Sequence, residues 1–198
     1  MAVVITQGER NRLITAGKAR NALKDPSWSR RKSDVFSDDE VDVLGMIGEY
    51  AVARYFGLSP DYSATVCGDT GSDIVWNGLR IAVKYNHRWK GFLMVEERQD
   101  DELDNGYLCD LASDIIVLAT GKCTPPQTCV CRHPGGIVVM LAGWCTGGEF
   151  LARMEKRDLG LGGRYIVRCD QLNPMHTLWQ PWLYMKSDID RCVKPDSK

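Results

Sequence analysis

The sequence predicts an α/β domain with a mixed, helix-flanked sheet, and three observations support this prediction. Three segments show the capping-box pattern, in which a Ser or Thr stands three residues before a Glu and opens a helix. Asn77-Gly78 lies between two apolar runs, which is the strongest short signal for a β-hairpin. Later apolar runs rich in β-branched residues are typical of buried strands. The resulting order of helix, strands, helix and strand favours the α/β class.

Each capping box predicts one helix. The first helix should end near Leu23, and the second should end at Gly57, since glycine commonly follows the last helical turn. The third should end near Lys156. The boxes that open these helices lie at 6–9, 37–40 and 146–149.

Six apolar segments are predicted strands. The first two form the hairpin around Asn77-Gly78, and a Cys- and Pro-rich insertion at 121–135 separates the fourth from the fifth. Residues 171–183 are expected to pack against the domain as a terminal segment. The predicted strands lie at 73–76, 79–85, 91–95, 113–121, 135–144 and 164–169.

Composition and charge indicate an ordinary soluble protein. The chain has 198 residues, 44% apolar residues and a formal net charge of -1, which gives no global attraction to nucleic acid. It contains no apolar stretch of the roughly 20 residues that cross a bilayer and no signal peptide pattern. We therefore expect a cytosolic protein without a membrane partner, whose eight cysteines are reduced or bound to metal.

The predicted hairpin brings three positions to one face of the sheet. A two-residue turn places Asp73 opposite Ala82, and directly opposed side chains share a face. Because side chains alternate along a strand, Lys84 shares that face, while Ile81 and Val83 point to the other. A simple cross-strand ion pair is one interpretation of Asp73 and Lys84, and a catalytic patch is the other.

Glu49 is the third candidate. It lies at the margin of the apolar stripe of the second predicted helix, where a carboxylate faces either the sheet or solvent. Gly45 and Gly48 each cost about 1 kcal/mol relative to alanine inside a helix. Their presence is explained if this helix approaches the sheet closely.

The helix with "GE", the segment "SDI", the hairpin and "IAVKYN" together resemble the core of the PD-(D/E)XK, or restriction-endonuclease-like, nuclease superfamily. Residues 38–155 carry the resemblance, which extends to phage and bacterial members. It implies a restriction-endonuclease-like fold and Mg²⁺- or Mn²⁺-dependent hydrolysis of phosphodiester bonds, in the cytoplasm of a bacterial or phage-infected cell. The implied metal ligands are Glu49, Asp73 and the backbone carbonyl of Val83, and Lys84 would assist the chemistry.

Ala82 departs from this pattern, because the superfamily carries Asp or Glu at that position. Three explanations are open: the protein has lost hydrolysis and kept binding, another acid such as Asp69 or Glu96 fills the gap, or alanine replaces a natural glutamate in this chain. The retention of Glu49, Asp73 and Lys84 favours the third explanation.

The Cys-rich insertion holds a second candidate metal site. A Cys₃His set is an accepted tetrahedral ligand set for structural Zn²⁺, but its spacing lacks the common C-x₂-C unit. A loop of reduced thiols is the alternative interpretation. The residues concerned are Cys123, Cys129, Cys131 and His133.

We expect nucleic acid as the partner, DNA in preference to RNA. The predicted organisation is a basic helical N-terminal arm over 1–36, followed by a nuclease-like domain over 37–198. The basic arm either contacts phosphates or forms a solvated helix face. Two further possibilities stay open. The protein could form a homodimer, and it could bind nucleic acid without catalysis while keeping the same fold. The candidate nucleic-acid-binding residues are Arg30, Arg31, Lys32, Arg88 and Lys90.

Overall fold

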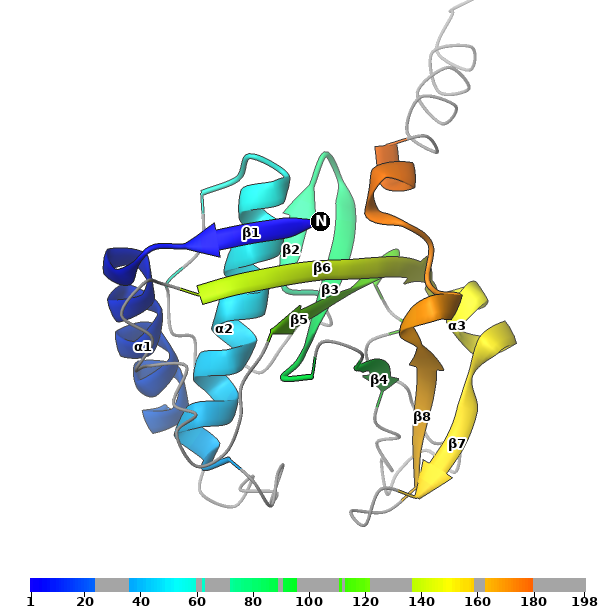
Figure 1. Cartoon of the computed structure of the whole chain (residues 1–198), viewed down its shortest axis with the longest axis horizontal. Helices are drawn as coiled ribbons and strands as arrows, with labels where there is room; N and C mark the ends of the chain where they lie inside the picture. The colour runs from blue at the N-terminus through cyan, green and yellow to red at the C-terminus, as the bar shows by residue number, and fades with distance from the viewer. Residues whose placement is uncertain are drawn as a thin grey trace, which may run out of the picture.

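The computed structural model shows a mixed α/β protein with two β-sheets (Figure 1). It describes residues 1–23, 36–59, 62, 72–88, 91–95, 111, 113–121, 137–158 and 163–179. The helices are α1 (Gln7–Ala22), α2 (Asp38–Tyr55) and α3 (Gly147–Arg153), with short 3₁₀ segments at Cys169–Gln171 and Met175–Trp179. The strands are β1 (Ala2–Ile5), β2 (Ile74–Trp76), β3 (Leu79–Asn86), β4 (Phe92–Val95), β5 (Ile115–Gly121), β6 (Ile137–Thr146), β7 (Glu155–Asp158) and β8 (Gly163–Arg168).

The larger sheet has the strand order β1-β6-β5-β3-β2. Its central pair, β3 and β5, is parallel, and the other neighbouring pairs are antiparallel, so the sheet is mixed. The smaller sheet is antiparallel, with the order β4-β8-β7. The predicted α/β class with a mixed sheet is therefore confirmed.

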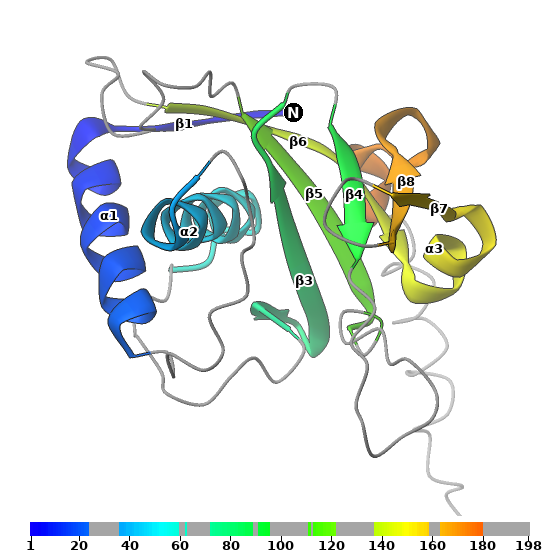
Figure 2. The ribbon, with the colours of Figure 1, turned by 90° about the horizontal axis from the view of Figure 1, so that it is seen from below.

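The two faces of the larger sheet are covered differently. Helix α2 packs on one face and α1 packs on α2, while the smaller sheet and α3 lie on the opposite side (Figure 2). Ile47, Val83 and Val117 belong to the apolar cluster on the α2 side. Ala82, Ile116 and Leu93 belong to the cluster on the side of the smaller sheet, with Phe150 of α3. We call these two faces the α2 face and the small-sheet face.

Local sequence signals account for the helix starts. The hydroxyls of Thr6, Ser37 and Thr146 each accept a hydrogen bond from the backbone N–H three residues later. The carboxylate of the glutamate at that later position accepts a hydrogen bond from the backbone N–H of the cap residue. Gly57 has φ +70°, which is the left-handed conformation expected just after a helix end. All three capping-box predictions are confirmed.

Two parts of the fold differ from the sequence prediction. Helix α3 ends at Arg153 rather than near Lys156, because residues 155–158 form β7 and pair with β8. Strand β1 was not predicted; it pairs with β6 at the edge of the larger sheet. Ile5 and Leu13 are fully buried in the cluster on the α2 face, so the described part of the predicted N-terminal arm shares the core of the domain.

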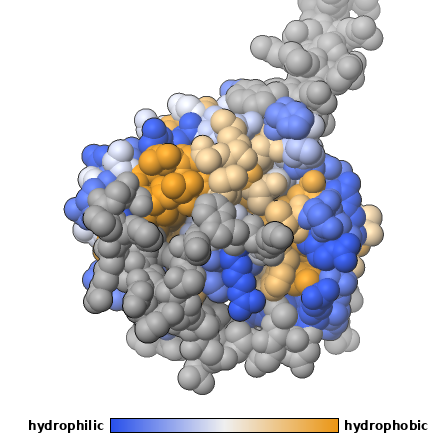
Figure 3. Space-filling view, in the orientation of Figure 1, coloured by the Kyte–Doolittle hydropathy of each residue, from blue (hydrophilic) through white to orange (hydrophobic). Residues whose placement is uncertain are grey.

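Apolar side chains gather on the outer surface over β1 and β6, as Figure 3 shows. Val4 and Val138 are paired across these strands on the small-sheet face, and they are 56% and 44% exposed. Among the described residues, no helix is long and apolar enough to cross a membrane.

Candidate functional site

The β2–β3 hairpin positions the candidate site. Asn77 and Gly78 have φ values of +49° and +86°, the left-handed conformations that a two-residue hairpin turn requires. Trp76 pairs with Leu79 and Ile74 pairs with Ile81, which is the register that the sequence predicts. The strand order β5-β3-β2 places this hairpin at one edge of the larger sheet.

Asp73 immediately precedes β2 and is bound to β3 by two hydrogen bonds. Its backbone N–H donates to the carbonyl of Ile81 at 2.9 Å. Its Oδ2 accepts the backbone N–H of Val83 at 2.6 Å, a short bond of the charge-assisted kind. The carboxylate of Asp73 therefore lies beside the segment that contains Ala82. This carboxylate accepts a hydrogen bond from the backbone N–H of Val83, whereas the resemblance implied the backbone carbonyl of Val83 as a metal ligand.

Ala82 and Lys84 lie on the small-sheet face. Val83 belongs to the cluster on the α2 face and Tyr85 packs against it, so the intervening Lys84 points the other way. Ala82 is 1% exposed and packs in the opposite cluster. Lys84 is half-buried. Position 82 is thus a buried apolar site in this chain, next to a lysine on the same face.

Glu49 extends from α2 toward α1. Its Oε1 accepts a hydrogen bond from Nη1 of Arg20 at 2.8 Å, and its Oε2 accepts one from Nη2 at 3.2 Å. Both carboxylate oxygens are therefore engaged by one guanidinium group. Because α2 covers the α2 face, Glu49 and the pair Ala82–Lys84 begin on opposite faces of the larger sheet.

Gly48 shows how closely α2 approaches β3. A Cβ atom built on Gly48 would lie 3.1 Å from Cβ of Tyr85 and 3.4 Å from Cγ1 of Val83, so only glycine leaves full clearance. A Cβ atom built on Gly45 would meet no atom of the described residues within 4 Å. The prediction of close approach is confirmed for Gly48 and is wrong for Gly45.

The described residues do not fit a divalent-cation site made of several carboxylates. Hard cations such as Mg²⁺ require about six oxygen ligands, of which carboxylates are the most common protein donors. Asp73 is bound to Val83, Glu49 is bound to Arg20, and Ala82 offers no ligand. In the part of the chain that the structure describes, no group of three or more His, Cys, Asp or Glu side chains could hold a metal ion.

Most of the remaining candidate residues fall outside the described ranges. This applies to the proposed zinc ligands Cys123, Cys129, Cys131 and His133, to Arg30, Arg31, Lys32 and Lys90, and to the substitute acids Asp69 and Glu96. Arg88 is described: it is exposed, and its backbone N–H donates to Oδ1 of Asn86 at 3.0 Å. Next to it, burial and the charge of Arg88 lower the pKa of His87.

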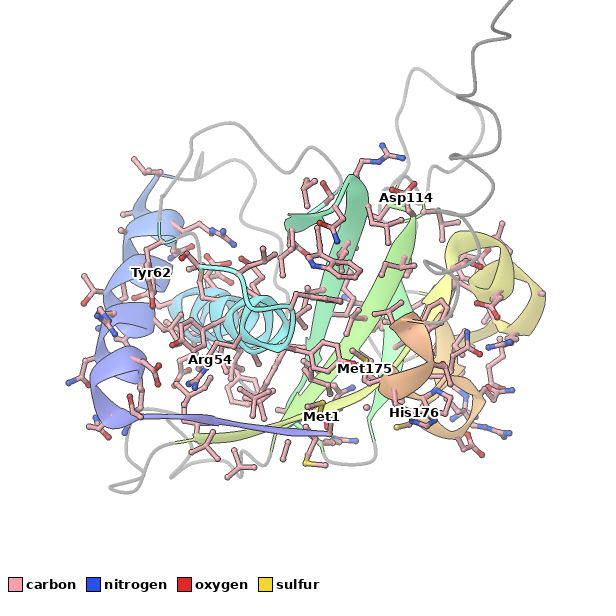
Figure 4. All side chains as sticks on the ribbon, turned by 90° about the horizontal axis from the view of Figure 1, so that it is seen from above. Met1, Arg54, Tyr62, Asp114, Met175 and His176 are labelled. Atoms are coloured by element: carbon pink, nitrogen blue, oxygen red, sulfur yellow. The ribbon has the colours of Figure 1, made fainter. Side chains whose placement is uncertain are left out.

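A second polar network joins α1 to α2. Tyr50 and Arg54 both donate hydrogen bonds to the carboxylate of Glu9, and Arg54, labelled in Figure 4, also reaches the carbonyl of Val4. Burial opposes the ionisation of Glu9, but the hydrogen bonds from Tyr50 and Thr6 outweigh it and lower the pKa to about 2. Neither this network nor the role of Arg20 was predicted, although the helical spacing of Leu13, Gly17 and Arg20 places them on one side of α1.

The fold and the site define a mixed α/β protein whose β2–β3 hairpin holds an aspartate against the strand that carries Lys84. Residues 2–91 match a family described as "Family of unknown function (DUF5843)". The matched segment includes Arg20, Glu49, Asp73 and Lys84. No curated protein and no solved structure matches the chain.

Proposed function

We propose that this protein is built as a metal-dependent nuclease that acts on DNA, and that its metal site is incomplete, because Ala82 offers no ligand and Glu49 is bound to Arg20. The observation that carries the proposal is the placement of Asp73. Its carboxylate is held 2.6 Å from the amide of Val83, between Ala82 and Lys84 in the chain, by a hairpin of defined register. This placement brings Asp73 beside the strand segment that holds position 82 and Lys84. The resemblance to PD-(D/E)XK nucleases rests on these three positions, so the placement supports the proposal.

Position 82 is the missing ligand that a single substitution can supply. Carboxylates are the preferred protein ligands of hard divalent cations, and alanine has no donor atom. We therefore expect the present chain to bind Mn²⁺ weakly and to hydrolyse nucleic acid slowly or not at all. A carboxylate at position 82 should raise both the affinity for Mn²⁺ and the rate of hydrolysis.

The test compares Ala82→Glu and Ala82→Asp with the unchanged chain. Position 82 is 1% exposed, so the shorter aspartate covers the case in which glutamate does not fit the apolar cluster. Each protein is incubated with plasmid, branched and single-stranded DNA and with RNA, in Mg²⁺ or Mn²⁺. We expect cleavage by at least one of the two variants, with DNA preferred.

Asp73→Asn in the active background is the matched control. The amide oxygen of asparagine still accepts the N–H of Val83, so the hairpin should be kept while a metal-binding charge is lost. Cleavage should disappear with Asp73→Asn. If both folded position-82 variants fail on every substrate with both metals, the nuclease proposal is refuted.

The second candidate function is nucleic-acid binding without catalysis, and two observations that count against a working metal site favour it over the nuclease. Ala82 packs tightly in an apolar cluster, and Arg20 engages both oxygens of Glu49. A protein of this kind should bind DNA with an affinity that falls as salt rises. Calorimetry should then detect no Mn²⁺ binding that depends on Asp73, even when position 82 carries a carboxylate.

The other proposals that accompany this function concern the partners and the location. We place the protein in the cytoplasm of a bacterial or phage-infected cell, and we keep the zinc site of the insertion and the homodimer as proposals. A zinc content near zero after purification without chelator would count against the zinc site.

A further inference from the structure

The smaller sheet turns one of its two faces away from the larger sheet. Leu93, Val95 and Val167 belong to the apolar cluster that the two sheets share, so they lie on the inner face. Side chains alternate along a strand, so the residues next to them in the chain lie on the outer face. Two of these residues are in contact, since Nη1 of Arg164 donates to Sδ of Met94 at 3.4 Å. The charged and aromatic side chains that the register places on this outer face are Phe92, Glu155, Arg157, Arg164 and Arg168.

Positive charge is concentrated on this outer face, although the whole chain has a formal net charge of -1. Among the described residues of its strands, arginines outnumber the single carboxylate. Arg157 forms an ion pair with Glu155 at 2.8 Å, and Arg168 forms one with Asp170, just beyond β8, at 3.3 Å. These four side chains are at least 41% exposed, so both pairs are of the weak surface kind. Both arginines can therefore exchange their partners for a phosphate.

Arg157 of β7 stands directly opposite Arg164 of β8. Directly opposed side chains share a face, and like charges in that arrangement repel each other. Arg164 is 8% exposed, so solvent screens its charge poorly. An anion between the two guanidinium groups replaces this repulsion by charge-assisted hydrogen bonds. A phosphate suits this position, because its oxygens match the planar fork of donors that each guanidinium presents.

An aromatic ring lies on the same face as the arginines. Phe92 of β4 is half-buried and stands directly opposite Arg168. Sites for single-stranded nucleic acid combine cationic side chains that follow the backbone with aromatic rings on which bases stack. Strand β4 also contacts β3, which carries Lys84, and Figure 2 shows β4 between β3 and β8. A nucleic-acid strand on this face therefore leads toward the proposed site.

We propose that the outer face of the smaller sheet binds single-stranded DNA, with one phosphate between Arg157 and Arg164 and a second phosphate at Arg168. Residues four apart in a strand are separated by roughly 13 Å, so these are two separate contacts. The inference rests on the proposed function, because it takes DNA as the partner and adds the surface that holds it. It involves no metal ion.

The test is fluorescence anisotropy with a labelled single-stranded DNA oligonucleotide at several NaCl concentrations, with EDTA present so that no divalent cation contributes. Arg157→Gln and Arg168→Gln should each weaken binding about tenfold, as expected from the loss of a hydrogen bond to a charged group. Each should also reduce the slope of log affinity against log salt by about 0.7, the value for one phosphate of a single strand. Glu155→Gln should tighten binding, because it releases Arg157 from its carboxylate.

Arg54→Gln and Asp38→Asn are the matched controls, and both should leave the affinity unchanged. Arg54 is 43% exposed and ion-paired, as Arg157 is, but it lies on α2, across the larger sheet. Asp38 is exposed at the start of α2, so Asp38→Asn makes the same change of net charge as Glu155→Gln. Melting temperatures establish that each variant is folded. The proposal is overturned if either Arg157→Gln or Arg168→Gln binds as tightly as the parent, or if the controls change the affinity as much as the test variants do.

Failure of this inference is distinguishable from failure of the proposed function. DNA binding that does not depend on Arg157 and Arg168 refutes the surface and leaves the nuclease proposal standing. Binding that depends on them, in a protein whose position-82 variants cleave no substrate, supports the surface and refutes the nuclease. Absence of DNA binding refutes the surface, and absence of cleavage as well refutes both.

Discussion

Helices α1 and α2 meet at Gly17, where added volume should be costly. A Cβ atom built on this residue would lie 2.8 Å from both Cα and Cγ2 of Val43. Favourable contacts between carbon atoms are about 3.5–4.0 Å long. Gly17→Ala therefore forces the two helices apart, because the Cα of Val43 belongs to the backbone of α2 and cannot rotate away.

The size of the effect follows from two opposing contributions. Overpacking of this kind costs about 1–3 kcal/mol, and the higher helix propensity of alanine returns about 1 kcal/mol. Gly45→Ala in α2 receives the same propensity gain without the clash, since no atom from the described part of the chain lies within 4 Å of its Cβ position. We expect Gly17→Ala to be less stable than Gly45→Ala by about 2 kcal/mol.

Differential scanning calorimetry measures this difference. For a chain of this size, 1 kcal/mol shifts the melting temperature by about 2–4 °C, so the two variants should differ by about 4–8 °C, with Gly45→Ala above the parent. Urea unfolding should give the same ranking. A Gly17→Ala protein that melts at or above the temperature of Gly45→Ala would refute the close contact between α1 and α2.

Two further predictions use groups outside the proposed site. Glu9 has a folded pKa of about 2, below its ordinary value of 4.5, so its contribution to stability is complete above pH 4.5 and is lost as the pH falls toward 2. Glu9→Gln should therefore remove about 1–2 kcal/mol of pH-dependent stability in urea unfolding between pH 2.5 and 5, and equal pH dependence in both proteins would contradict this. Burial, with a smaller contribution from Glu149, raises the pKa of Cys145 to about 12, so iodoacetamide at pH 8 should leave Cys145 unlabelled in the folded chain and label it after unfolding. Labelling of the folded chain at the unfolded rate, read by peptide mapping, would show that Cys145 is accessible.

The sequence was most informative where the cause of a structure lies within a few residues. Each capping box is closed by bonds between residues three apart, so the helix starts at Gln7, Asp38 and Gly147 were predictable. The hairpin register follows from the left-handed conformations of Asn77 and Gly78. Asp73 could be placed beside β3 for the same reason.

Contacts between residues far apart in the sequence account for the features that were not predicted or were predicted wrongly. The direction of Glu49 depends on Arg20, 29 residues away in the chain, and no helical periodicity of α2 contains that information. Strand β1 exists through its pairing with β6, which begins at Ile137. Residues 155 and 156, which were expected in the third helix, belong to β7 instead, because β8 supplies a strand with which they pair.

By itself, the sequence determined the three helix starts, the hairpin register, the face that Ala82 shares with Lys84, and the place of Asp73 at the hairpin. Only the tertiary structure decided that Ala82 is buried against Leu93 and Ile116 and that Glu49 is paired with α1. The physical reason is the range of the interactions: turns and caps are completed by neighbouring residues, whereas burial and ion pairing depend on which distant elements the packed core brings together.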